Sequence, residues 1–151
     1  MNTFDLRIDH MLKVLDESYL IYTADPTLRG TDGNGGCYYE TKDGKKCSVG
    51  RCMLPSVVGR HLGGNVEDLV DEREDMLEVK SLDPMLQKKY RGLPLKFWYE
   101  LQGWHDNDTV WYPESKYPVG AEGVVWGRVG FKGVYRTYIE LRDKIVAGEF
   151  C

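Results

Sequence analysis

The stretch from Cys37 to Gly50 reads Cys-Tyr-Tyr-Glu-Thr-Lys-Asp-Gly-Lys-Lys-Cys-Ser-Val-Gly, and it decides the expected fold class. Its centre, Asp43-Gly44, is a strong signal for a two-residue turn between antiparallel strands. With that turn, Glu40 lies opposite Cys47 and shares a face with it, because side chains alternate along each strand. Cys37 then points to the opposite face. The stretch therefore predicts a small β-hairpin.

Helical patterns flank this hairpin on both sides. Apolar residues recur at helical spacing from Phe4 to Tyr19, which predicts an amphipathic N-terminal helix. Similar patterns predict a C-terminal helix over about residues 133–147 and shorter helices over residues 65–79, after Asp83-Pro84 and over residues 94–105. The expected fold is a single α+β domain over residues 1–151. It is mainly helical, with amphipathic N- and C-terminal helices around a small antiparallel β-hairpin.

Charge and hydropathy exclude several classes of function. The net charge of −4 argues against binding nucleic acid through bulk electrostatic attraction. No apolar run approaches the about 18 residues of a membrane-spanning helix, and the N-terminal residues lack the pattern of a secretory signal. We therefore expect a cytoplasmic protein that does not act in a membrane. Its four cysteines are interpreted first as thiols or metal ligands and second as disulfides.

Two patches of the sequence carry a resemblance to a known family. The first is Cys37-x-Tyr39, then Gly44-x-x-Cys47-x-Val49-Gly50, then Leu54-Pro55; the second is Leu-Gln-x-x-His-Asp over residues 101–106. This pattern resembles a family of small uncharacterised proteins of bacteriophages and bacteria, in which the segment after His-Asp is usually shorter. The resemblance implies a phage or prophage setting, hence a host cytoplasm, and a shared design of the hairpin with His105-Asp106. No activity is known for the family, so it implies no catalytic role.

A thiol enzyme is one hypothesis for the two patches. Cys47 would be the nucleophile, His105 its base and Asp106 the carboxylate that orients the base, since a neighbouring imidazole stabilises a thiolate. Against this, His105 and Asp106 are adjacent, so Asp106 could not easily orient the imidazole while both face one pocket. The favoured interpretation is that Cys47 is a small core residue and His105 a hydrogen-bonding residue at a helix end.

A zinc site is a weaker hypothesis, with Cys37, Cys47, Cys52 and His61 as candidate ligands. Structural zinc sites favour ligand pairs separated by two to four residues, and only the gap between Cys47 and Cys52 fits. The hairpin register would also place Cys37 and Cys47 on opposite faces. We therefore expect no metal and no cofactor, and interpret these cysteines as buried thiols.

An acidic run over residues 67–78 includes Glu72 and Asp75. Runs of this kind are most often the solvated face of a helix. The alternative is a negative surface that docks onto a basic partner. The total charge is too small for the whole molecule to imitate DNA.

Aromatic and basic residues gather later in the chain. The aromatic residues are Trp111, Tyr112 and Trp126, and the basic residues Arg128, Lys132 and Arg136 recur every four positions. On one helix the basic residues would form a ridge that holds a phosphorylated ligand whose base stacks on a ring. Gly130 and Gly133 argue against a continuous helix there. Alternatively, the rings anchor a loop or serve as hot spots of an interface.

Three functions follow, in order of preference. The first is a non-enzymatic interaction protein, a phage or prophage accessory factor that binds and modulates a host protein. The second is a binder of a nucleotide or other phosphorylated small ligand, using the aromatic residues and the basic ridge. The third is a thiol-dependent enzyme that uses Cys47 and His105. The sequence leaves the oligomeric state open.

Overall fold

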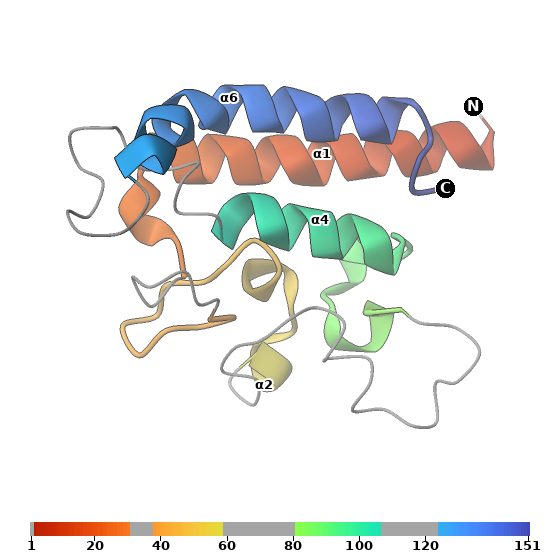
Figure 1. Cartoon of the computed structure of the whole chain (residues 1–151). Helices are drawn as coiled ribbons and strands as arrows, with labels where there is room; N and C mark the ends of the chain where they lie inside the picture. The colour runs from red at the N-terminus through yellow and green to blue at the C-terminus, as the bar shows by residue number, and fades with distance from the viewer. Residues whose placement is uncertain (1, 31–37, 59–80, 107–123) are drawn as a thin grey trace.

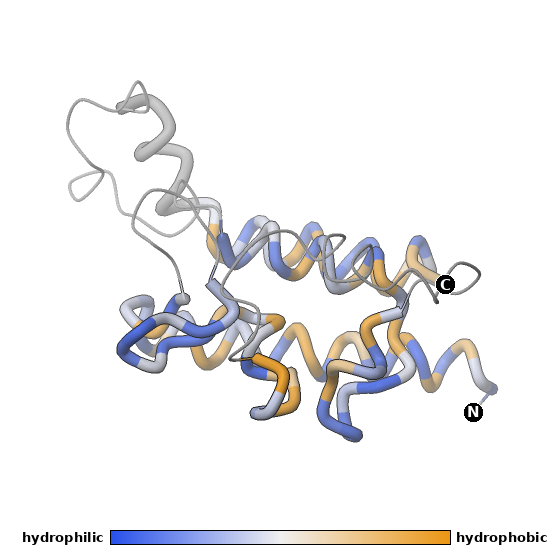
Figure 2. The backbone as a smooth tube through the Cα atoms, turned by 90° about the horizontal axis from the view of Figure 1, so that it is seen from below, coloured by the Kyte–Doolittle hydropathy of each residue, from blue (hydrophilic) through white to orange (hydrophobic). Residues whose placement is uncertain are grey.

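The computed structural model describes residues 2–30, 38–58, 81–106 and 124–151, and of residues 124–132 it describes the backbone alone. Three long helices dominate these residues: α1 (Thr3–Ala24), α4 (Leu95–Asp106) and α6 (Val124–Val146) (Figure 1). α1 begins at Asn2, whose side chain accepts a hydrogen bond from the Asp5 N–H at 2.8 Å, a donor that the helix itself leaves unsatisfied. Figure 2 shows apolar and polar stretches alternating along α1, as in an amphipathic helix.

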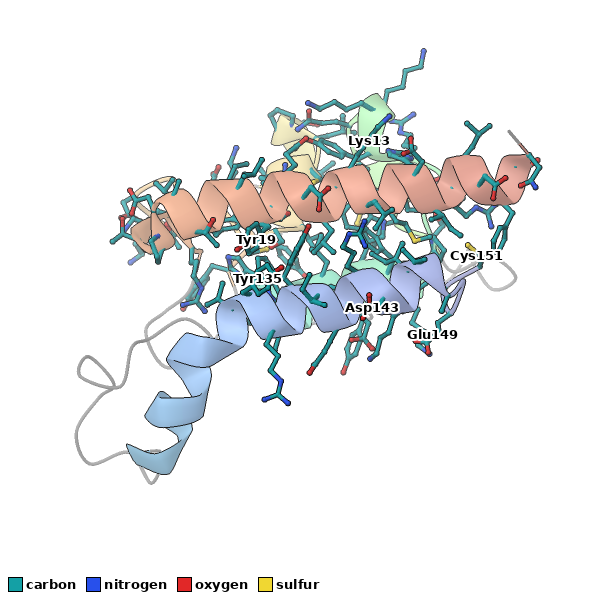
Figure 3. The ribbon with its side chains drawn as sticks, turned by 90° about the horizontal axis from the view of Figure 1, so that it is seen from above. Lys13, Tyr19, Tyr135, Asp143, Glu149 and Cys151 are labelled. Carbon is teal, nitrogen blue, oxygen red and sulfur yellow. The ribbon has the colours of Figure 1, made fainter. Side chains whose placement is uncertain are left out.

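The three helices lie along one another. α1 and α6 are antiparallel, which brings the two chain ends together (Figure 1). There the Phe4 ring covers Gly148 so closely that an added Cβ would lie 2.7 Å from it. α4 runs in the same direction as α1, and its Trp104 lies near Tyr19, with ring centroids 6.4 Å apart. Tyrosines join α1 to α6: Tyr19 lies beside Tyr135 (Figure 3), and the rings of Tyr19 and Tyr138 stack with centroids 4.2 Å apart.

The remaining described elements are short turns beside α1 and α4. They are η1 (Pro26–Leu28), η2 (Gly50–Cys52), α2 (Pro55–Val58), η4 (Asp83–Met85) and η5 (Lys88–Tyr90). Backbone hydrogen bonds from Leu54 N–H to Met85 O (2.8 Å) and from Gln87 N–H to Cys52 O (2.9 Å) join the segment around η2 to the segment around η4. Residues distant in sequence thereby present their apolar side chains to the same core.

Apolar side chains from the helices and the turns form one buried cluster. α4 contributes Phe97, Trp98 and Leu101, while Phe150, beyond the end of α6, packs against Phe97 with ring centroids 6.4 Å apart. The other members include Met11, Val14, Leu15, Tyr22, Tyr39, Cys47, Val49, Cys52, Met53, Leu82, Leu86, Leu93, Leu141 and Ile145. Each large aliphatic member stabilises the fold by about 1.5–3 kcal/mol relative to an exposed side chain.

The predicted β-hairpin and the α+β fold class are wrong, because the part of the chain that the structure describes is mainly helical and contains no β-strand. Asp43-Gly44 does lie in a turn, with Gly44 at φ +84°. However, Thr41 N–H donates to Lys45 O at 2.7 Å, and Glu40 pairs with Lys46 instead of Cys47. Two isolated bridges form beside the turn, an antiparallel one between Glu40 and Lys46 and a parallel one between Arg29 and Lys46.

The pairing stops at Lys46 for two physical reasons. The Thr41 hydroxyl accepts a hydrogen bond from the Lys45 N–H at 3.0 Å, a local bond that competes with a strand ladder. The Lys46 carbonyl accepts a hydrogen bond from the Tyr22 hydroxyl at 2.6 Å, and the chain then turns into η2. The segment is therefore held by α1, by local turns and by single bridges instead of by a ladder with a partner strand.

The helices agree with the sequence patterns to different extents. α1 and α4 form where the N-terminal and residue 94–105 patterns predict helix. α6 begins at Val124, well before residue 133, and continues through Gly130 and Gly133. The expected helix over residues 65–79 lies outside the described residues. Within the described part, no helix is both long and apolar enough to cross a membrane.

Candidate functional site

The two described cysteines that the sequence singles out are both buried core residues. Cys47 is 0% exposed, and its sulfur accepts a hydrogen bond from the Gly50 N–H at 3.3 Å. The Cys52 thiol donates to the Ser48 carbonyl at 3.4 Å, and burial raises its pKa to about 12. A thiol of this kind stays protonated at neutral pH and is a poor nucleophile. Because Cys37 and His61 lie outside the described residues, the structure tests neither the candidate zinc set nor the expectation that no metal binds.

His105 lies fully buried in the last turn of α4. Its Nδ1 is 2.7 Å from a carboxylate oxygen of Asp106. The expectation that adjacent positions would prevent Asp106 from orienting His105 is therefore wrong: the Asp106 side chain reaches the ring at the helix end. The Tyr22 ring lies edge-on to the imidazole, with centroids 4.7 Å apart. The imidazole is held in one orientation by a carboxylate and an aromatic ring.

A buried arginine caps the end of α4 beside this imidazole. Arg29 is 5% exposed, and its Nε and Nη2 donate to the His105 carbonyl at 2.9 and 2.7 Å. The carbonyls in the last turn of a helix lack backbone donors and carry the negative end of the helix dipole, so a guanidinium there is favourable. This contact gives the His105 backbone a structural role. The sequence offered no signal for it, since Arg29 lies in a loop.

The structure does not join the thiol to its proposed base. Among the described residues, no hydrogen bond links the Cys47 sulfur to the His105 imidazole. Tyr22 contacts both neighbourhoods, because its ring touches His105 and its hydroxyl donates to the carbonyl of Lys46, the residue before Cys47. The arrangement fits two residues that share a core better than a reacting pair.

A second polar cluster joins α1 to the turns. The Arg51 guanidinium donates to the Glu17 carboxylate, to the Tyr90 hydroxyl at 3.2 Å and to the Ser18 hydroxyl at 2.9 Å. Burial raises the pKa of Glu17, but hydrogen bonds from Tyr90 and Arg51 outweigh it and leave the pKa below its ordinary value. This cluster was not predicted, because its members come from three distant segments.

A groove between α4 and α6 is a concave feature of the described residues that could receive a ligand. Its volume is about 310 Å³. α4 lines it with Tyr99, Glu100, Gln102, Gly103, Trp104 and Asp106, and α6 lines it with Thr137, Glu140, Leu141 and Lys144. Pockets for small ligands occupy about 300–1,000 Å³, so this groove suits a single side chain or a small molecule.

The walls of the groove combine rings with charge. Tyr99 is 45% exposed, whereas Trp104 is nearly buried and its indole N–H points to the Val134 carbonyl at 3.5 Å. Gly103 lies between them on α4, and an added Cβ would meet no atom within 4 Å. The glycine therefore leaves its part of the groove open.

For most residues predicted to bind a partner or ligand, the structure does not describe the side chain. Glu72, Asp75, Trp111 and Tyr112 lie outside the described residues, and for Trp126, Arg128 and Lys132 the backbone alone is described. Arg128, Lys132 and Arg136 do lie at four-residue intervals on one helix, contrary to the expectation drawn from the glycines. Arg136 is exposed, and its Nε is 3.6 Å from a Glu140 oxygen beside the groove.

Searches with the sequence against protein-family models and curated proteins, and with the fold against solved structures, find no significant similarity. The chemistry of the groove and of the polar clusters is therefore the basis for assigning a function.

Proposed function

We propose that this protein is a non-enzymatic interaction protein, a phage or prophage accessory factor that binds a host protein and modulates it. The groove between α4 and α6 is the observation that carries this proposal. It combines an exposed tyrosine with a tryptophan in its wall, two residue types that are enriched at interface hot spots. The resemblance of the two sequence patches to phage proteins supplies the phage setting.

The two alternative functions have less support among the described residues. A nucleotide would bring phosphate charge, and the groove holds the carboxylates of Glu100, Asp106 and Glu140 against the single ammonium of Lys144. The basic ridge stays a prediction, since two of its three side chains are not described. The thiol enzyme requires a reactive Cys47, and this side chain is fully buried.

The test uses two substitutions at one position. Gly103→Trp places a large ring in the open space of the groove beside Gly103, whereas Gly103→Ala replaces the same glycine without filling that space. We expect wild type and Gly103→Ala to capture the same identified protein from a bacterial host lysate, and Gly103→Trp to lose it. Circular dichroism and thermal unfolding of each variant establish that the fold is kept.

A folded Gly103→Trp variant that still captures the partner would show that the groove is not the interface. Purified partner, once identified, replaces the lysate in calorimetric titrations with the same three proteins. An affinity that does not differ between Gly103→Ala and Gly103→Trp would have the same meaning.

A further inference from the structure

We infer that the α4–α6 groove receives a basic side chain, so that the partner presents an arginine- or lysine-bearing segment to it. This inference rests on the proposed function and specifies the chemistry of the partner. The first ground is charge. Three carboxylates line the groove, those of Glu100, Asp106 and Glu140, against one ammonium, that of Lys144. A cationic side chain meets a complementary field there, and an anionic one meets repulsion.

The three carboxylates differ in whether another residue of the protein already pairs with them. Glu140 is exposed, and its Oε1 lies 3.6 Å from Arg136 Nε. One Asp106 oxygen is engaged by His105 Nδ1 at 2.7 Å. Glu100 is half-buried and, within the described residues, has neither a hydrogen bond nor an ion pair. Glu100 is therefore the acceptor that a ligand would engage first, since a partly buried carboxylate gains most from a paired cation.

An exposed ring supplies the second ground. Tyr99 directly precedes Glu100 on α4, lines the groove and is 45% exposed. Trp104 also lines the groove, but it is nearly buried and its indole N–H is directed to the Val134 carbonyl. A guanidinium or ammonium that lies against the Tyr99 ring gains a cation–π attraction while its nitrogens bond to a carboxylate. A groove of about 310 Å³ has room for one long side chain.

The test measures binding of hexa-arginine, hexa-lysine and hexa-glutamate peptides to the full chain by heteronuclear NMR titration. We expect the two basic peptides to shift the amide resonances of Glu100, Gly103 and Lys144, and the acidic peptide to leave them unchanged. Glu100→Gln, which removes the charge and keeps the shape, should weaken hexa-arginine binding about tenfold. Glu140→Lys, at an exposed position, should weaken it similarly, so the test does not depend on one variant.

The matched control is Asp143→Lys. Asp143 is exposed on α6, next to Lys144 in sequence but outside the groove lining (Figure 3). It changes the total charge as Glu140→Lys does, and should weaken binding by less than about twofold. Equal losses in the two variants would show a general attraction to the negative molecule and overturn the inference. Absence of basic-peptide binding would overturn it too, as would self-association that buries the groove between two copies.

The two proposals fail separately. If Gly103→Trp loses the host partner while Glu100→Gln and Glu140→Lys keep it, the groove is an interface but its occupant is not basic. If Gly103→Trp keeps the partner, the groove is not the interface and both proposals fall.

Discussion

Cys47 and Cys52 occupy core positions that a solvent-borne reagent does not reach, whereas Cys151 is exposed. We therefore predict that iodoacetamide at neutral pH modifies Cys151 first and modifies Cys47 and Cys52 only when the protein unfolds. The raised pKa of Cys52 adds to its protection, because the thiolate is the reactive form. Peptide mapping by mass spectrometry after timed labelling, with and without urea, measures the order. Early modification of Cys47 would instead favour the thiol enzyme.

Arg29 is a buried charge that caps α4, and its loss should be costly. Arg29→Met removes both hydrogen bonds to the His105 carbonyl while keeping much of the side-chain volume. We predict a decrease of about 2–3 kcal/mol in the free energy of unfolding, measured by urea denaturation. Arg136→Met is the matched control, since Arg136 is exposed and forms only a loose pair with Glu140. It should change stability by less than about 0.5 kcal/mol. Equal effects would show that the cap does not hold the fold together.

For single residues, the sequence indicated which side chains are buried or hydrogen-bonded, but it did not reveal which residues they contact. It interpreted Cys47 as a core thiol and His105 as a hydrogen-bonding residue at a helix end, and the structure gives both residues those surroundings. It missed the contact from Asp106 to His105, because adjacent side chains diverge inside a helix but can meet where the helix ends. Arg29 was missed because its partner is seventy-six positions away.

Gly103 in α4 and Gly44 in the turn test how the backbone conformation of an element determines the effect of replacing a glycine. An added Cβ would meet nothing within 4 Å at Gly103 or at Gly44. Gly103 is helical, so Gly103→Ala should stabilise the protein by about 0.5–1 kcal/mol. Gly44 has a φ of +84°, where L residues are strained, so Gly44→Ala should destabilise it by about 1 kcal/mol. Urea denaturation of both variants measures the signs. A loss of stability in Gly103→Ala would show that the α4 backbone needs glycine there.

Helices α1 and α4 could be predicted from the sequence, whereas the failure of the predicted hairpin to form could not. Apolar spacing in α1 and α4 is a local signal that survives into the fold. The turn at Asp43-Gly44 is also local, but a strand needs a partner, and here Lys46 is held by Tyr22 from α1. The start of α6 was placed too late because glycine carries a helix penalty of about 1 kcal/mol, which the surrounding chain overrides. The groove needs two helices at once, so neither helix pattern alone could reveal it.

At the scale of the whole molecule, the cluster of Glu17, Arg51 and Tyr90 ties α1 to η2 and η5, and it makes stability depend on pH. The pKa of Glu17 is lowered in the folded state below its ordinary value of 4.5. At acid pH the unfolded chain therefore binds more protons than the folded chain at this site. The free energy of unfolding must fall as the pH falls through this range.

We predict that the urea midpoint of the wild type falls more steeply from about pH 5 downward than that of Glu17→Gln, which has no carboxyl group to protonate. The matched control is Asp9→Asn, which removes an exposed carboxylate from the same helix. It should retain the wild-type slope. Parallel curves for wild type and Glu17→Gln would show that the cluster contributes no acid sensitivity.

The sequence alone gives less information about function than about the fold. The resemblance only implies a phage setting as an expectation, and the composition argues against binding nucleic acid in bulk. The groove that supports the proposed function is lined by residues that the sequence analysis did not select, apart from Asp106. Its carboxylates and rings are ordinary surface residues until α4 and α6 come together, so their meaning depends on the tertiary structure.

The meeting of the two chain ends also has a consequence during synthesis. Phe4 covers Gly148, and Phe150 packs on Phe97 in the core. A nascent chain can therefore form α1 and α4 early, but it cannot close the core until Gly148 and Phe150 have left the ribosome. Such contacts between distant residues slow folding, because a long loop must be ordered before they form. Until then, the apolar faces of α1 and α4 lack their α6 partner, and this is the interval in which a chaperone would bind the chain.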